Sequence, residues 1–308
     1  MNRRTFLKQV AAAGLEGAAA TSLFASQIAP QQNDSKLDQV GVSTWSFHNF
    51  FTATRDHRAP PLTGNPWDAR EFAEMIADRY HVHQLEIVAP HISTERSYIR
   101  ELKERIEKAH SRLVNVPVDI EELEKGGGLS DPDPRLRNEI IDACTKWIDI
   151  AHELGARSVR CDPGKINPAD LAPTVSSYRS LASHAASKDM HVIIENHGGV
   201  GSEHPEELVE IFKAVGNHCG ALPDFGNFPN ETTRQNGLKL LFPFARTVCH
   251  AKGLQFDAGG NETAFDFAQC VNTAKSAGFR GVYSIEIGRQ GDPYEKVQLV
   301  ANELLRYL

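Results

Sequence analysis

Acidic and imidazole side chains stand at the ends of four successive apolar segments in the second half of this chain. They are Glu195, Asp224, His250 and Glu286, and a glycine-containing turn follows each of them. An unpaired buried carboxylate is unfavourable, and three carboxylates cannot gather without a cation between them. One imidazole nitrogen and three carboxylate oxygens therefore indicate a site for one divalent metal ion. We expect Mn²⁺ first, with Mg²⁺, Co²⁺ or Zn²⁺ as alternatives.

The alternative for each of these four residues is a structural ion pair or a hydrogen-bonded polar group of the core. That explanation serves for any one residue alone. Four successive segments that carry Glu, Asp, His and Glu at equivalent positions favour the metal site.

Two further polar residues flank the proposed ligands. His197 follows Glu195 by two positions, and Lys252 has the same relation to His250, so the alternation of a strand points each pair the same way. The lysine can offset negative charge and stabilise an enolate oxygen. We take Glu195, Glu286, His197 and Lys252 as the catalytic candidates. For His197 the alternative is support of a ligand, and for Lys252 a charge-balancing ion pair.

Residues in the first half of the chain are candidates for substrate binding. Glu86 ends the segment LEIVAP and would contact substrate or form a buried pair with an arginine. Arg160 would be that partner or hold an anionic group of the substrate. Trp45 would pack against a sugar face, although aromatic core filling explains it as well. Phe47 and His48 share both explanations with Trp45, whereas His91 and Asp162 lie in expected loops without an assigned role.

The elements that must position these residues alternate regularly between β-rich and helical patterns. The expected strands are 39–47, 84–89, 113–119, 158–162, 191–197, 220–225, 247–252 and 281–287. The expected helices include 68–80, 95–111, 135–154, 168–188, 205–215, 265–277 and 293–308. Eight strand–helix units predict a single-domain (β/α)₈ TIM barrel over residues 38–308, whose active site lies at the C-terminal ends of the strands.

A doubly wound open sheet is the alternative fold. No G-x-G-x-x-G follows the first strand, which weakens its dinucleotide-binding version. The glycine run at residues 126–128 predicts a flexible loop on the active-site face, either a lid or a plain surface loop.

The N-terminus differs from the rest of the chain. Arg3 and Arg4 precede an apolar, alanine-rich stretch, which predicts a twin-arginine type signal peptide over residues 1–25 and a flexible mature N-terminus over 26–37. We therefore expect a periplasmic or secreted protein with no stable membrane span after removal of the signal. A short amphipathic helix is the alternative.

Composition limits the partners. The formal net charge is −7, which argues against sequence-independent binding to nucleic acid. The five cysteines show no C-x-x-C spacing, which excludes a zinc knuckle, and we expect buried unpaired thiols. A small carbohydrate is the expected partner, and a homo-oligomer is compatible with the sequence.

The strand-end motifs IIENHGG, PDFGN, CHAKG and YSIEIG resemble the xylose isomerase-like TIM barrels, also called sugar phosphate isomerases/epimerases. The resemblance extends over roughly residues 40–308. It implies that Glu195, Asp224, His250 and Glu286 are the metal ligands. It also implies a hydroxy-carbonyl sugar bound through vicinal oxygens, with the two glutamates as acid and base on opposite faces.

The sequence departs from the ketose 3-epimerases of that family. Asn227 stands where those enzymes and the related abasic-site endonucleases carry a histidine, and we count it as a candidate for substrate binding. Gly201 and Phe256 replace a glutamate and an arginine of the epimerases. The metal set is kept, but the residues that recognise the ketose are not.

The leading hypothesis is a metal-dependent isomerase or epimerase that removes a proton next to the carbonyl of a sugar or keto-sugar. Export argues against sugar phosphates as substrates. The alternative is a lyase or dehydratase that acts on a keto-sugar, keto-glycoside or keto-inositol through the same proton abstraction. A non-catalytic sugar-binding barrel is the third hypothesis.

Overall fold

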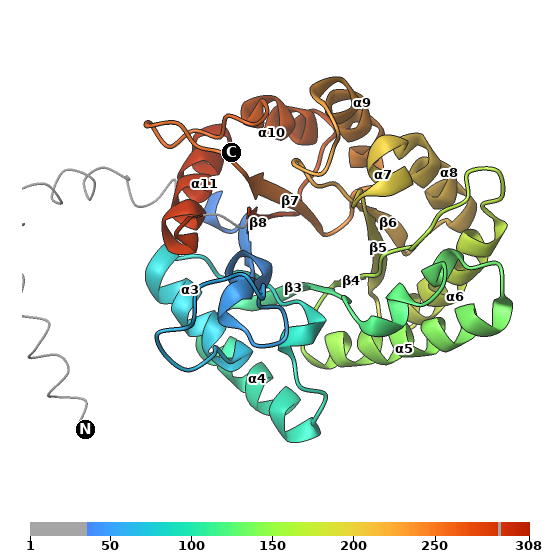
Figure 1. Cartoon of the computed structure of the whole chain (residues 1–308), viewed down its shortest axis with the longest axis horizontal. Helices are drawn as coiled ribbons and strands as arrows, with labels where there is room; N and C mark the ends of the chain where they lie inside the picture. Colours follow the sequence, from blue (N-terminus) through green and yellow to red (C-terminus); the bar gives the residue numbers. More distant parts are fainter. Residues whose placement is uncertain (1–35, 289–290) are drawn as a thin grey trace, which may run out of the picture. The chain divides into compact units, whose positions relative to one another are not determined.

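Eight parallel β-strands surrounded by helices make up the described part of the chain (Figure 1). The computed structural model describes residues 36–288 and 291–308. The single-domain TIM barrel predicted from the sequence is confirmed. The predicted signal peptide, and the predicted tail apart from Lys36 and Leu37, lie outside the described residues.

The strands form one sheet in the order β6-β5-β4-β3-β2-β1-β8-β7. Their bounds are β1 Val40–Ser43, β2 Gln84–Glu86, β3 Arg112–Pro117, β4 Ser158–Arg160, β5 His191–Glu195, β6 Cys219–Leu222, β7 Val248–Gly253 and β8 Val282–Ile287. Each paired strand is parallel to its neighbour, because the intervening helices return the chain to the same end of the sheet.

The junction between β6 and β7 closes the barrel. These strands share no continuous ladder and meet at two isolated parallel bridges, Ala221 with Ala245 and Asp224 with His250. The amide of His250 donates to the carbonyl of Pro223 at 2.9 Å, and the amide of Phe225 donates to the carbonyl of His250 at 3.1 Å. Two predicted metal ligands therefore lie at the closure of the barrel.

Helices return the chain from the end of one strand to the start of the next. Their bounds are α3 Phe72–Tyr80, α4 Arg96–Lys108, α5 Pro134–Glu153, α6 Ala172–Ala186, α7 Gly199–Glu203, α8 Pro205–Val215, α9 Glu231–Leu241, α10 Phe267–Ser276 and α11 Pro293–Tyr307. Several begin with an aspartate or asparagine cap; Asp133, for example, accepts from the amide of Arg135 at the start of α5.

Strand alternation explains why the polar strand ends face inward. Ile193, Leu222 and Val248 form an apolar cluster of their own, separate from the large core between sheet and helices. Each lies two residues before a predicted ligand, so the ligands share its face of the sheet. The apolar cluster therefore lies beneath a polar layer at the C-terminal ends of the strands.

The first strand is shorter than predicted. It ends at Ser43, and residues Thr44–Phe50 form a 3₁₀ segment, η1, because the Ser43 hydroxyl accepts from the amide of Trp45 and turns the chain. Trp45, Phe47 and His48 therefore belong to a turn above the strand.

The glycine loop after β3 is not an unstructured lid. It contains two 3₁₀ turns, η4 (Glu121–Glu124) and η5 (Gly128–Ser130). The Asp131 carboxylate accepts from the amide of Gly127 at 2.7 Å, and the amide of Lys165 donates to the carbonyl of Gly127 at 2.9 Å. The loop is thereby joined to the loop after β4.

The cysteines follow the prediction, since all five are free and buried. Within the described residues, no helix has the length and apolar character needed to cross a membrane.

Candidate metal centre and active-site cavity

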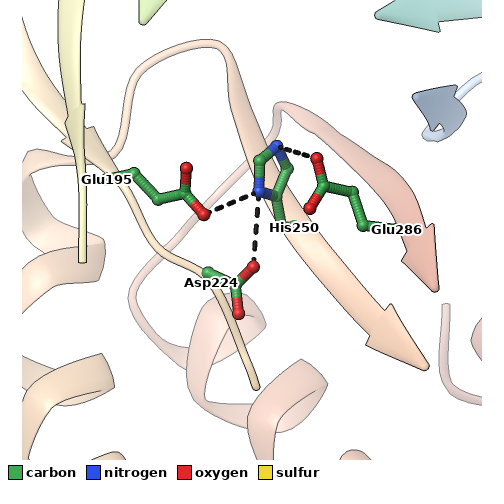
Figure 2. A group of neighbouring side chains, drawn as sticks. All are labelled: Glu195, Asp224, His250 and Glu286. Atoms are coloured by element: carbon green, nitrogen blue, oxygen red, sulfur yellow. Dashed lines mark hydrogen bonds and ion pairs between the residues drawn. The ribbon is translucent and has the colours of Figure 1, made fainter. Parts of the chain in front are cut away.

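The four strand-end residues meet in one cluster. Each of Glu195, Asp224, His250 and Glu286 offers a ligand atom, and these atoms lie within 4.8 Å of one another (Figure 2). All four residues are at most 4% exposed. The sequence therefore predicted correctly that these residues come together.

The imidazole of His250 lies at the centre of the cluster. Its Nδ1 lies 3.1 Å from Glu195 Oε1 and 3.4 Å from Asp224 Oδ2, and its Nε2 lies 3.6 Å from Glu286 Oε1. The two glutamates approach the ring from opposite sides (Figure 2). Burial alone would lower the pKa of His250, but Glu286, Glu86 and Glu195 outweigh it and raise the pKa well above its usual value.

Lys252 supplies a second positive charge. Its Nζ lies 2.7 Å from Glu286 Oε2 and 2.9 Å from Asp224 Oδ2. Burial would raise the pKa of both carboxyls, but Lys252 and His250 hold both below their usual values. A Cβ on Gly226 would lie 2.6 Å from Lys252 Cγ, so glycine is needed there for the lysine to reach Asp224.

Glu195 is held by residues of β4 and of the turn after β6. Asn227 Nδ2 donates to Glu195 Oε1 at 2.9 Å, and Arg160 Nε lies 3.3 Å from Glu195 Oε2. The side chain of Asn196, the residue after Glu195, fixes the backbone of Asp224. Its Oδ1 accepts from the Asp224 amide, and its Nδ2 donates to the Asp224 carbonyl. Asn227 therefore orients one predicted ligand.

His197 lies at the more exposed edge of this cluster, with its side chain 57% exposed. Its Nδ1 lies 3.0 Å from Asp162 Oδ2. The hydrogen bond to Asp162, together with the charge of Glu195, raises the pKa of His197 to about 9. Asp162 also lies 3.0 Å from Arg160 Nη1. The trio Asp162, Glu195 and His197 has ligand spacing too, but Arg160 and the protonated His197 together balance the charge of its two carboxylates.

A cavity of about 430 Å³ opens beside the cluster. Glu195, Glu286, His197, Lys252 and Arg160 line it, so all four catalytic candidates and the substrate-binding candidate Arg160 face the same space. Trp45 lines it as well, stacked on His48 with ring centroids 4.9 Å apart. Apolar residues and the glycine loop form another part of the wall: Val88, Val118, Ile120, Leu123 and residues 126–128.

Glu86 does not occupy the position expected of it. It is fully buried and is absent from the cavity wall, and its carboxylate Oε1 lies 3.0 Å from His250 Nε2. Arg160 pairs with Asp119, Asp162 and Glu195, so the expected Glu86–Arg160 pair is wrong. Glu86 lies on β2, across the barrel from β7, and its histidine partner is 164 residues away in sequence. Local patterns could not reveal that contact.

The donor set suits a divalent metal ion. Asp224 Oδ2 is buried and accepts no hydrogen bond among the described residues; it is approached by the cationic groups Lys252 and His250. Carboxylates around the cluster outnumber Arg160 and Lys252, and a divalent cation would reduce that excess. Three carboxylates and one imidazole in a buried cluster form a ligand set that Mn²⁺, Mg²⁺ or Co²⁺ accepts.

Sequence reasoning missed three residues of this region. Asp119 accepts a hydrogen bond from Arg160, and Asn115 donates one to Glu86. Asn196 forms two hydrogen bonds with the backbone of Asp224. Asn196 directly follows a predicted ligand, so its position was a usable signal. Asn115 lies on β3 and Asp119 follows that strand. No metal ligand was predicted on β3, so no signal in the sequence pointed to these two residues.

Comparisons with known proteins agree with this architecture. A family model described as xylose isomerase-like TIM barrel matches residues 71–307. A comparison with curated proteins found no significant match.

Solved structures show the same fold at low sequence identity. D-psicose 3-epimerase with D-tagatose from Clostridium cellulolyticum H10 has 16% identity and a TM-score of 0.64, covering 87% of this chain and 98% of that chain. A xylose isomerase-like TIM barrel protein from Mycobacterium smegmatis in complex with magnesium has 14% identity and a TM-score of 0.61, covering 87% and 96%. The probable 3-DHS dehydratase AsbF from Bacillus anthracis has 11% identity and a TM-score of 0.59, covering 86% and 98%.

Proposed function

The chain belongs to the xylose isomerase-like TIM barrel family, and from that premise we propose that it is a divalent-metal-dependent isomerase or epimerase of a sugar or keto-sugar. One observation carries the proposal. Glu195 and Glu286 approach the central histidine from opposite sides, and both line one cavity together with Lys252 (Figure 2). Two carboxylates so placed can remove a proton from one face of a bound carbon and return one from the other.

The residues that line the cavity would have separate roles in the reaction. Glu195 is held by Arg160 and Asn227, and Glu286 by Lys252, so each carboxylate keeps a fixed direction. Lys252 Nζ would donate to the substrate oxygen that gains negative charge as the proton leaves. Trp45 would cover the apolar face of the sugar ring at the cavity wall.

The proposed cofactor is one divalent ion, Mn²⁺ first, held by Glu195, Asp224, His250 and Glu286. When bound, it would polarise the substrate carbonyl and so acidify the adjacent carbon. The neighbour from Mycobacterium smegmatis, described as a complex with magnesium, supports a divalent ion in this fold.

A lyase or dehydratase is the second candidate, and His197 is the observation that favours it. Its Nδ1 is fixed by Asp162, and its ring lines the cavity beside Glu195. An imidazole so placed could protonate a leaving hydroxyl or glycosyl group, which an epimerase does not need. A dehydratase among the structural neighbours supports this candidate.

Isotope exchange separates these functions. The Mn²⁺-loaded protein is incubated in D₂O with free ketoses, aldoses and 3-keto-glycosides, and products are followed by ¹H NMR and mass spectrometry. Deuterium uptake beside the carbonyl, with or without a second isomer, supports the leading function. Release of water or aglycone supports the lyase. Absence of exchange and of release with every compound, metal bound, would contradict both and leave the sugar-binding barrel.

Export to the periplasm remains part of the proposal and is tested separately. Replacing Arg3 and Arg4 together by lysine should leave the precursor in the cytoplasm, because the paired arginines are what the twin-arginine pathway recognises. Cell fractionation measures the outcome. Normal export of the double variant would contradict the twin-arginine assignment.

A further inference from the structure

Beneath the metal-ligand cluster, a chain of hydrogen bonds crosses the interior of the barrel. It runs from His250 to Glu86 (3.0 Å), from Glu86 to Asn115 (2.9 Å), from Asn115 to Ser158 (2.8 Å) and from Ser158 to Thr247 (2.6 Å). Every member is at most 5% exposed. The chain starts on β7, crosses β2, β3 and β4, and returns to the residue that precedes β7.

Donor and acceptor chemistry gives this chain one direction. Glu86 is a carboxylate that can only accept, so Asn115 must face it with the amide nitrogen. The remaining Asn115 oxygen then accepts the proton of Ser158, and Ser158 in turn accepts from the Thr247 hydroxyl. On one side, every donor in the chain therefore points toward Glu86, and Asn115 donates to its Oε2. On the other side, Glu86 Oε1 meets His250 Nε2, which must donate an N–H to it.

This direction determines which hydrogen bond each of the two ring nitrogens of His250 can make. Nε2 must carry a proton to meet Glu86 Oε1. Nδ1 faces two of the other ligands, at 3.1 Å from Glu195 Oε1 and 3.4 Å from Asp224 Oδ2, whereas Glu286 Oε1 lies 3.6 Å from Nε2. Nδ1 donates to Glu195 Oε1 in the metal-free cluster, so a cation bound beside Glu195 and Asp224 would take the place of the Nδ1 proton while Nε2 keeps its own.

We propose that Glu86 is a positioning residue of the metal centre: it binds the Nε2 proton of His250 and presents Nδ1 to the divalent ion, while Asn115, Ser158 and Thr247 fix Glu86 in turn. The inference rests on the metal centre of the proposed function. Partners that orient a metal-bound histidine typically change metal affinity by a factor of about 10 to 100.

Two substitutions at Glu86 separate its charge from its acceptor oxygen. Glu86→Met removes the acceptor, and we expect Mn²⁺ binding to weaken by about 100-fold. In Glu86→Gln, the side-chain oxygen can still accept from His250 if the Asn115 amide reverses toward Ser158. We expect this variant to weaken Mn²⁺ binding by only about 10-fold.

The matched control is Glu303→Gln. Glu303 is also a buried carboxylate, 3% exposed, but it lies on α11 and accepts from the amide of Glu262. The Glu303→Gln variant should keep Mn²⁺ affinity within about twofold of the parent, since Glu303 contacts no residue of the ligand cluster.

Two readouts test the proposal. The Kd for Mn²⁺ is measured by electron paramagnetic resonance of the free ion. The metal-bound ring nitrogen is identified by ¹¹³Cd–¹⁵N coupling in Cd²⁺-loaded, histidine-labelled protein. We expect Cd²⁺ on Nδ1 in the parent and a protonated Nε2, and a loss of that single arrangement in Glu86→Met.

Other results would contradict the positioning role of Glu86. Parental Mn²⁺ affinity in folded Glu86→Met, or Cd²⁺ on Nε2 in the parent, would overturn the positioning role while leaving the proposed function intact. Should Glu86→Met not fold, parental affinity in Glu86→Gln overturns it instead. A parent that binds no Mn²⁺ would overturn the metal centre, and with it both proposals.

Discussion

His91 and His250 are both buried, but they lie in different halves of the barrel and in different surroundings. His91, 7% exposed, stacks on Phe51 with ring centroids 3.7 Å apart, and its Nε2 lies 2.6 Å from the Thr54 hydroxyl. Burial, with a smaller contribution from His48, lowers the pKa of His91 to about 3. Around His250, carboxylates outweigh burial and raise the pKa.

The difference shows that burial alone does not distinguish a structural polar residue from a functional one. The His91 region is neutral: the ring stacks on Phe51 and its Nε2 meets the Thr54 hydroxyl, while Nδ1 has no hydrogen-bond partner among the described residues. The His250 region gathers more negative charge than its own cations balance. An excess of charge that folding alone does not require points to a ligand.

Removing a carboxylate from the charged region should abolish metal binding. We expect Asp224→Ala to lose essentially all of the Mn²⁺ that the parent holds, because Asp224 is one of the four buried groups that could hold the ion and its carboxylate already attracts the cationic groups of Lys252 and His250. Metal content after gel filtration measures this. Asp142→Ala, an exposed aspartate on α5, is the control and should keep its metal. Full occupancy in Asp224→Ala would contradict the metal centre.

Replacing Glu195 or Glu286 by glutamine should separate metal binding from proton transfer. The amide oxygen can still coordinate, so part of the metal should remain. Exchange of the proton beside the carbonyl should fall by a factor of about 10² to 10⁴, the usual size of a general acid–base contribution. Deuterium uptake on an active sugar measures the rate. If Glu286→Gln exchanges at the parental rate with metal bound, Glu286 is a ligand only, and the base must be His197 or Lys252.

Lys252→Met should lower the same exchange rate by a factor of about 10² to 10³, by analogy with the loss of one oxyanion donor. Methionine has a similar shape but cannot donate to a negatively charged oxygen. Metal content, measured in parallel, should remain near the parental level. Loss of metal with an unchanged rate per bound ion would assign Lys252 to charge balance alone.

The neutral region should respond to acid. His91 has a folded pKa of about 3, below its usual 6.5. The unfolded chain therefore binds a proton that the folded chain refuses between these values. The free energy of unfolding should fall as the pH drops from about 6.5 toward 3, by up to about 1.4 kcal/mol per pH unit from this group.

His91→Phe keeps a ring against Phe51 but cannot take up that proton. Urea unfolding of the metal-free parent and variant at pH 7, 5 and 4 compares their stabilities. The variant should be less stable at neutral pH, where it lacks the Thr54 hydrogen bond, and the difference should narrow in acid. Parallel curves would mean that His91 does not titrate on unfolding.

Much of the fold and of the ligand set follows from local sequence patterns. The eight strands and the inward direction of the ligands follow from alternation. An apolar residue two positions earlier fixes the face for Glu195, Asp224 and His250, whereas Glu286 follows the buried Ser284 at the same spacing. The contacts of Glu86 do not follow. They depend on which strands lie opposite one another across the barrel, and no pattern within a single strand records that.

Two segments show where local preference gives way to tertiary contacts. Trp45 and Phe47 lie in a β-rich sequence, yet the Ser43 cap turns the chain into η1. Helix α9 was not predicted, since its threonines and Gly237 disfavour a helix. The structure explains the glycine: a Cβ there would lie 2.4 Å from Phe228 Cε1, and the close packing of that ring holds the helix.

The closure of the barrel bears on how fast an ion could enter or leave. Asp224 and His250 face each other at the junction of β6 and β7, and the two backbone hydrogen bonds at that bridge involve His250 itself. A brief separation of the two strands would move both side chains apart at once. The residence time of a bound ion should therefore follow the frequency of this local opening. Hydrogen exchange at the His250 and Phe225 amides would report it directly, and slow release is expected wherever those amides are protected.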